Sequence, residues 1–359
     1  MKGRSLKLLL DARGWTQARL ADELGRAQPE VSRWINGLRQ IPESVHDDLT
    51  NALGVSADGI DLLDTALPPT ASPVHYRKLK SVGSRRISHF DAFTTVLGVA
   101  VDQLLESLDF TVDHTIPDLV GMAADEAASH VRALWRLGNE PIPHLISVLE
   151  AAGVFVVGHD FGVRQVSGMS TVTPKGRVLM LYNRTSGWDR IRFTLAHELA
   201  HSIIHSDGIL DEHVEVEADE FAAHLLMPAD AFRGVVRRTG TDLTSFVSTK
   251  HYWRASVAAQ VVHARRLDLV PESKYRTLNR QINGRGWRLA EPHPIAPEEP
   301  TLWRELLDAH GQVGADVDDL ARLSSVLTPA QVAELAPHLT WSPITPKGDA
   351  DVVALSHRR

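Results

Sequence analysis

The sequence predicts an α+β chain that is predominantly helical, with a small sheet of about three strands. Three observations lead to this fold class. Much of the chain has the three-to-four-residue apolar spacing of amphipathic helices, and three short β-rich runs stand together between residues 153 and 182. Glycine and proline separate these elements. At 359 residues the chain is long enough for two or three domains.

Composition excludes several classes of protein. Hydrophobic residues make up 43% of the chain, so it is not a disordered protein. The net charge of −7 gives no global attraction to nucleic acid, and any DNA contact must come from a local patch. With no cysteine, a zinc ion would need histidine and carboxylate ligands. The longest early apolar run, Leu8–Leu10, is too short for a signal peptide, and no stretch is long enough to span a membrane. We expect a cytoplasmic protein without membrane contact.

The first 64 residues predict an all-helical unit. Thr16 is a suitable N-cap for a helix over residues 17–24, and Gly25 stands where such a helix would end. A second helix is expected over residues 28–36, before Gly37. Two short helices joined by a glycine-containing turn have helix-turn-helix geometry.

This unit resembles the XRE/Cro-type repressor domain. The matching positions are Thr16-Gln17, Leu20-Ala21, Leu24-Gly25, Val31-Ser32, Trp34, Asn36-Gly37 and Ala52-Leu53-Gly54. The resemblance implies that the unit binds double-stranded operator DNA, with its second helix in the major groove. It nominates Gln28, Glu30 and Arg33 for bases and Gln17, Ser32 and Asn36 for phosphates. The alternative is a helical module that binds protein instead of DNA.

A proline-rich and then basic linker is expected over residues 65–86, followed by a helical connector over 87–140. The next domain, 141–230, contains the three β-rich runs, which are residues 153–158, 164–172 and 176–182. Pro174-Lys175-Gly176 predicts a hairpin between the last two. The strand near Gly168–Val172 could bind an extended substrate by strand addition.

A helical segment after these strands carries the residues of a metal site. His197 and His201 are four residues apart and therefore share one helix face, where two imidazoles can bind one zinc ion. Glu198 is placed to take a proton from a water molecule activated by that ion. His205 lies too far along a straight helix to join the same ion and is expected to be a supporting or packing residue.

The third ligand is expected from the next helix. Glu215 and Asp219 are four residues apart and share a face, so we expect Glu215 to bind the ion and Asp219 to fix the ring of a ligating histidine. Glu217 remains an alternative ligand. Tyr182, Arg192 and His224 are nearby candidates for stabilising a developing oxyanion, and the sequence does not choose among them.

These residues carry a second resemblance. Residues 192–201 (RFTLAHELAH), 215–218 (EVEA) and 221–228 (FAAHLLMP) are similar to the ImmA/IrrE family of metallopeptidases. The resemblance implies a zincin-like domain with an HExxH active-site helix, bound Zn²⁺ and a protein substrate. The family's ligands and catalytic glutamate correspond to His197, His201, Glu215 and Glu198. Its association with cleaving helix-turn-helix repressors makes a repressor or antitoxin the expected substrate.

The remainder is less informative. Residues 231–292 resemble the helical extension of longer fused regulators in this family, and residues 293–359 have no assigned role. The sequence as a whole predicts a DNA-binding transcription regulator fused to a zinc endopeptidase that cleaves a regulatory protein or itself. One alternative is a non-cleaving regulator whose zinc domain is a sensor, and another is the regulator of a toxin–antitoxin module. A homodimer is one option for its assembly.

Overall fold

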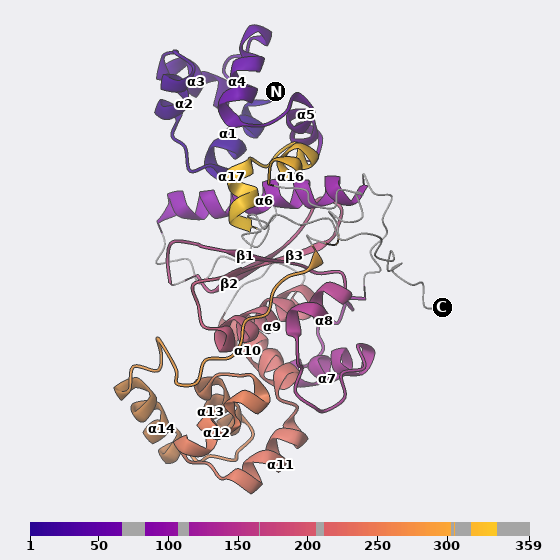
Figure 1. Cartoon of the computed structure of the whole chain (residues 1–359), viewed down its shortest axis with the longest axis vertical. Helices are drawn as coiled ribbons and strands as arrows, with labels where there is room; N and C mark the ends of the chain where they lie inside the picture. The colour runs from indigo at the N-terminus through magenta and orange to yellow at the C-terminus, as the bar shows by residue number, and fades with distance from the viewer. Residues whose placement is uncertain are drawn as a thin grey trace, which may run out of the picture.

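The computed structural model of the chain describes residues 1–66, 83–106, 115–164, 166–205, 212–302, 305 and 317–335. These residues form a predominantly helical molecule with a three-stranded sheet near its middle (Figure 1). The predicted fold class is confirmed. No helix in the described ranges combines the length and the apolar character that a membrane span requires.

The N-terminal unit lies at the top of Figure 1. Its α-helices are α1 (Gly3–Ala12), α2 (Gln17–Glu23), α3 (Gln28–Ile35), α4 (His46–Leu53) and α5 (Ala57–Ala66). The hydroxyl of Thr16 accepts a 3.0 Å hydrogen bond from the amide of Arg19 and so caps α2. Gly25 and Gly37 follow α2 and α3 in left-handed conformations that glycine adopts without strain. The two predicted helices are therefore confirmed to within one residue.

The long helix α6 (Ser84–Glu106) lies between this unit and the sheet (Figure 1). Phe90 and Phe93 of α6 belong to one hydrophobic core that extends from α1 to the near face of the sheet. Most of the linker expected over 65–86 falls outside the described residues. Its last two basic residues, Arg85 and Arg86, are part of α6, so the helix begins earlier than expected.

The sheet contains β1 (Phe155–His159), β2 (Gly168–Val172) and β3 (Val178–Asn183), in the order β1-β3-β2. β2 and β3 are antiparallel, and the amide of Gly176 donates a 2.9 Å hydrogen bond to the carbonyl of Thr173 in the turn between them. This confirms the predicted hairpin. β1 pairs with β3 in parallel, which the sequence did not indicate. Both β1 and β2 are therefore edge strands among the described residues.

The far face of the sheet is covered by α9 (Trp188–Ile204), and α8 (Leu145–Ala151) packs on β1. Behind α9 lie α10 (Glu212–Leu226) and α7 (Ala124–Leu134) (Figure 1). Gly168 allows α9 to approach β2 closely, because a Cβ there would lie 2.5 Å from Cγ2 of Thr194. The start of β2 is thus held directly against the middle of α9.

Four more helices continue the same hydrophobic core at the bottom of Figure 1. They are α11 (Ala229–Thr239), α12 (Leu243–Trp253), α13 (Val257–Arg266) and α14 (Glu272–Gly284). Phe232, Trp253 and Ile282 belong to the same core as Val156 and Met180 of the sheet. The expected helical extension therefore packs as part of the body that holds α9 and α10.

Residues 291–302 form an extended strap that runs back from α14 toward the sheet (Figure 1). Buried charges fix the strap in place. Lys250 is fully buried and lies 2.7 Å from Asp189 and 3.1 Å from Glu291, while Glu298 forms a buried ion pair with Arg192. Each buried charge thus has a partner of opposite sign, as a folded interior requires.

Two helices beyond the strap return to the N-terminal unit. These are α16 (Val317–Ser324) and α17 (Pro329–Leu335), which lie against α6 and the sheet (Figure 1). The carbonyl of Ser325 accepts a 3.1 Å hydrogen bond from the amide of Ser56, and the Ser325 hydroxyl accepts a 2.8 Å bond from Gln103. The chain beyond residue 335 lies outside the described residues.

Candidate metal centre

The sequence HELAH lies in the second half of α9, where all residues from 195 to 201 are buried. His197, Glu198 and His201 are 3%, 6% and 2% exposed. The helix begins after Gly187, and the side chain of Asp189 in its first turn is held by Lys250. A buried position is costly for polar side chains unless each has a partner. The surroundings of these three residues therefore decide what the site can do.

Three side chains converge as a metal site would require. His197, His201 and Glu215 each offer one ligand atom, and these atoms lie within 4.8 Å of one another. Nε2 of His197 lies 3.1 Å from Nε2 of His201 and 3.7 Å from a Glu215 oxygen, and His201 Nε2 lies 3.6 Å from the other oxygen. Four ligands at zinc distances in a tetrahedron would be separated by about 3.3 Å. The group thus has the spacing and the donor types that fit a zinc ion.

Asp219 lies behind the first histidine. One of its carboxylate oxygens is 2.8 Å from Nδ1 of His197, the ring nitrogen that faces away from Glu215. A proton on Nδ1 then donates to Asp219 and leaves the lone pair of Nε2 for a metal ion. The structure places Asp219 where the sequence argument expected it, one helical turn beyond Glu215.

A second chain of contacts lies behind the other histidine. Nδ1 of His201 is 3.2 Å from Nδ1 of His205, and Nε2 of His205 is 3.1 Å from Glu217. His205 and Glu217 are therefore placed to fix the ring of His201 as Asp219 fixes that of His197. Glu217 lies outside the group of three ligand atoms, and so does His205. The sequence predicted that His205 is a supporting or packing residue but did not reveal its link to Glu217.

Glu198 has a partner that the sequence did not suggest. The hydroxyl of Ser170 on β2 donates a 2.9 Å hydrogen bond to Oε2 of Glu198. Ser170 is itself buried, on the strand that Gly168 holds against α9. The alternation of a strand could have shown that Ser170 and Gly168 share a face, but only the fold brings them to Glu198.

The three oxyanion candidates are engaged elsewhere. The guanidinium of Arg192 donates to Glu298 and to the carbonyls of Arg254 and Ile142. The ring of Tyr182 packs against Trp188, and burial raises the pKa of its hydroxyl. These contacts hold both side chains in the packing of the domain.

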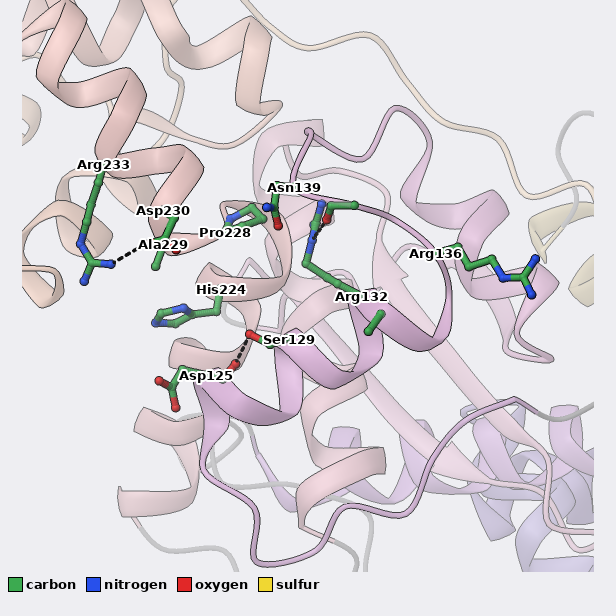
Figure 2. A pocket seen from close by; sticks show the side chains of 12 residues that line it. Asp125, Ser129, Arg132, Arg136, Asn139, His224, Pro228, Ala229, Asp230 and Arg233 are labelled. Atoms are coloured by element: carbon green, nitrogen blue, oxygen red, sulfur yellow. Dashed lines mark hydrogen bonds and ion pairs between the residues drawn. The ribbon is translucent and has the colours of Figure 1, made fainter.

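His224 lines a different pocket, of about 660 Å³, between α7 and the junction of α10 with α11 (Figure 2). This pocket shares no lining residue with the one beside His197. Burial lowers the pKa of His224. Arg132 of α7 also lines this pocket. It donates to the carbonyls of Gly138 and Glu140, at 2.8 and 2.5 Å, and so holds the turn after α7.

The candidate DNA-binding residues lie on or near α3 of the N-terminal unit. Gln28, Arg33 and Asn36 are exposed, whereas Gln17, Glu30 and Ser32 are half-buried. Gln28 donates a 3.0 Å hydrogen bond to Gln17, and Asn36 donates to the carbonyl of Ser32 at 2.9 Å. Glu30 lies 3.7 Å from both Arg26 and Arg39, so these two positive charges frame it. The α3 surface thus presents amides and cations together.

Comparison with known families agrees with this organisation. A family model described as the IrrE N-terminal-like domain, Peptidase_M78, matches residues 149–265, which include all the residues of the candidate metal centre. A helix-turn-helix domain model matches residues 3–63. A search of curated proteins finds no significant match. The chain therefore carries an IrrE N-terminal-like domain of the M78 peptidase family together with an N-terminal helix-turn-helix domain.

Proposed function

We propose that this protein is a DNA-binding regulator whose second domain is a zinc-dependent endopeptidase. The observation that carries the proposal is the convergence of His197, His201 and Glu215 within 4.8 Å, next to Glu198. Two imidazoles and one carboxylate form the ligand set of many peptidase zinc sites, and they leave the fourth position open for substrate or water. A purely structural site would be closed by a fourth protein ligand.

Each residue near the candidate metal centre would have its own role in peptide hydrolysis. Zinc, when bound, would polarise the scissile carbonyl and the attacking water. Glu198 would accept the proton of that water and pass it to the leaving amine. Ser170 would hold the carboxylate of Glu198 in the orientation for both transfers, through the 2.9 Å hydrogen bond. Asp219 and the His205–Glu217 pair would keep the two ligating rings in one tautomer.

An extended polypeptide is the substrate form that suits this site. β2 is an edge strand, and residues 167, 169, 171 and 173 use their main-chain groups to pair with β3. The alternate residues Gly168, Ser170 and Val172 therefore direct their main-chain groups away from β3. A substrate strand that pairs with these residues would lie beside Glu198. Ser170 is one of the residues that would pair with it, and the Ser170 hydroxyl donates to the carboxylate of Glu198.

Strand addition has its own test. Val172→Pro removes an outward amide at a side chain that is 57% exposed, so the core is unaffected. Cleavage should fall strongly while zinc binding stays unchanged. Val172→Thr keeps the amide and is the matched control. Equal cleavage by both variants would rule out pairing at this position.

The helix-turn-helix domain supports the DNA-binding half of the proposal. With α3 in the major groove, Arg33 and Gln28 would face base edges, with Glu30 between them. Gln17, Ser32 and Asn36 would contact phosphates. A peptidase joined to such a reader is suited to gene control, so we infer that its substrate is a regulatory protein, such as a repressor or an antitoxin, or the chain itself.

A comparison of fragments in the native host tests the whole proposal. Wild-type protein and Glu198→Gln would be expressed at equal levels, before and after DNA damage, and all protein fragments would be identified by mass spectrometry. We expect fragments of one regulatory protein with the wild type alone. If both proteins bind zinc and neither produces fragments, the zinc domain acts as a sensor and the peptidase assignment is wrong.

A further inference from the structure

A second pocket opens directly beside the candidate metal centre. It has a volume of about 330 Å³ and includes His197 and Asp219 in its wall. Its other walls include the first half of α9, helix α13, and Arg288, which follows α14. A side chain next to the scissile bond of a bound substrate would therefore have this pocket within reach. What the pocket accepts would determine which bonds are cut.

Three arginines give this pocket a positive charge. Arg190, Arg266 and Arg288 line it, and Asp219 is the acidic residue among its lining residues. The carboxylate of Asp219 already faces Nδ1 of His197. Arg190 donates to the carbonyl of Trp287 at 3.0 Å, and Arg288 donates to the amide side chains of Asn283 and Asn279, all of which are neutral acceptors. No carboxylate within the described residues forms an ion pair with any of the three.

Arg266 is the least satisfied of these arginines. It is the last residue of α13 and is half-buried, and its Nη1 is buried with no hydrogen-bond partner among the described residues. Leaving a buried donor without an acceptor costs about 1–3 kcal/mol, and more when the donor is charged. Its position in a pocket wall indicates that the missing acceptor comes from a bound molecule.

The rest of the wall indicates what kind of molecule carries that acceptor. Phe193, Ala223, Ala259 and Val262 are apolar and line the same pocket. An aliphatic stem with a terminal carboxylate matches an apolar wall with arginines at its edge. Inorganic anions have no such stem.

We propose that this pocket binds an aspartate or glutamate side chain of the substrate, next to the scissile bond, and that Arg266 is its main specificity-determining residue. The inference rests on the proposed endopeptidase function, because it names the substrate class of that same site. Arg266 would select the bond to be cleaved by binding the acidic side chain beside it, and Arg190 and Arg288 would add to the electrostatic attraction of that side chain.

A degenerate peptide library tests the pocket in two ways. In the first, the zinc-loaded full chain cleaves the library and the fragments are sequenced. In the second, the library is passed over immobilised zinc-loaded Glu198→Gln protein and the retained peptides are sequenced. We expect aspartate and glutamate to be enriched about 10-fold or more at one fixed position beside the cleaved bond and among the retained peptides.

Charge reversal identifies the residue responsible. Arg266→Glu should replace the acidic preference with a preference for lysine and arginine, and Arg266→Gln should abolish it. Arg265→Glu is the matched control, because Arg265 is the adjacent residue on α13 but pairs with Glu272 and Asp268 outside the pocket. Thermal melting and zinc binding would verify that the variants are folded.

The outcomes separate the two proposals. Acidic peptides retained without any cleavage would support the pocket and overturn the endopeptidase assignment. Cleavage without an acidic preference, or with the same preference in Arg266→Gln, would overturn the pocket inference and leave the endopeptidase in place.

Discussion

The hydroxyl of Ser170 donates a hydrogen bond of 2.9 Å to the carboxylate of Glu198, and both side chains are buried. This contact joins the edge strand β2 to the helix that carries the candidate metal ligands. It also uses one of the two carboxylate oxygens, so the other has a defined direction. The strand proposed to pair with the substrate, β2, is therefore directly linked to Glu198, the proposed general base.

Ser170→Ala tests the importance of this contact. The variant should lower kcat roughly 10-fold or more, because a hydrogen bond to a charged group contributes about 1.5–3 kcal/mol. Zinc affinity should not change, since Ser170 is not one of the three candidate ligands. Ser202→Ala is the control, because the Ser202 hydroxyl donates to the main-chain carbonyl of Glu198, at 3.3 Å, rather than to its carboxylate. If the two variants have the same kcat, orientation of Glu198 by Ser170 has no role in the reaction.

The choice of the third metal ligand can be measured without a substrate. Glu215→Ala should weaken zinc binding by more than about 100-fold, because it removes a direct ligand, while Glu217→Ala should retain zinc to within about 10-fold. Glu217 contacts His205 and His213, and neither is in the ligand group. Zinc titration against a chelator of known affinity gives both values. Retention by Glu215→Ala and loss by Glu217→Ala would reverse the assignment.

Asp219→Ala should have an intermediate effect. Without the carboxylate at 2.8 Å from its Nδ1, the ring of His197 loses the partner that sets its tautomer, and zinc affinity should fall about 10–100-fold. Glu220→Ala, which changes the next residue of α10, should have no such effect. The same zinc titration provides the measurement. An affinity within twofold of the wild type would show that Asp219 does not support the ligand.

His263 predicts a specific loss of stability in acid. Burial lowers the pKa of this fully buried histidine to about 3, while the unfolded chain binds the proton near pH 6.5. The stabilising contribution is therefore complete above pH 6.5 and is lost as the pH falls toward 3. By pH 5 the loss amounts to about 2 kcal/mol.

Chemical denaturation of the metal-free protein measures this effect. His263→Gln keeps a donor for the carbonyl of Met227, which lies 2.9 Å from the ring, and should lose about 2 kcal/mol less than the wild type between about pH 7.5 and pH 5. His130→Gln, at an exposed histidine, should behave as the wild type. An unchanged pH dependence in His263→Gln would mean that other groups determine the acid sensitivity.

Features with a local cause could be predicted from the sequence. The caps and glycines around α2 and α3 act over a few residues, so both helices were placed correctly. The positions of Glu215 and Asp219 on one helix face followed from the four-residue spacing. The structure brings His197, His201 and Glu215 together as that spacing implied.

Contacts between distant segments could not be predicted in this way. Ser170 and Glu198 meet only because β2 packs against α9, and the parallel pairing of β1 with β3 depends on the whole domain. Glu298 lies 106 residues from Arg192, in a region to which the sequence assigned no role. A single sequence has no local signal for which acid is buried, because burial is decided by what packs over it.

The buried pair of Arg192 and Glu298 provides the last prediction. Glu298 is 3% exposed, pairs with the fully buried guanidinium of Arg192 and also accepts a 3.0 Å hydrogen bond from the amide of Ile146. Glu298→Ala should lower the free energy of unfolding by about 3–5 kcal/mol, because it leaves the charge of Arg192 buried without a partner.

Glu299→Ala, at the exposed neighbour, is the control and should change the free energy of unfolding by less than about 0.5 kcal/mol. The double variant Arg192→Met/Glu298→Met should recover much of the loss, since a buried ion pair can be replaced by apolar side chains of similar size. Denaturant titrations of the three variants would decide the matter: equal stability of Glu298→Ala and Glu299→Ala would mean that the strap is not held by this pair.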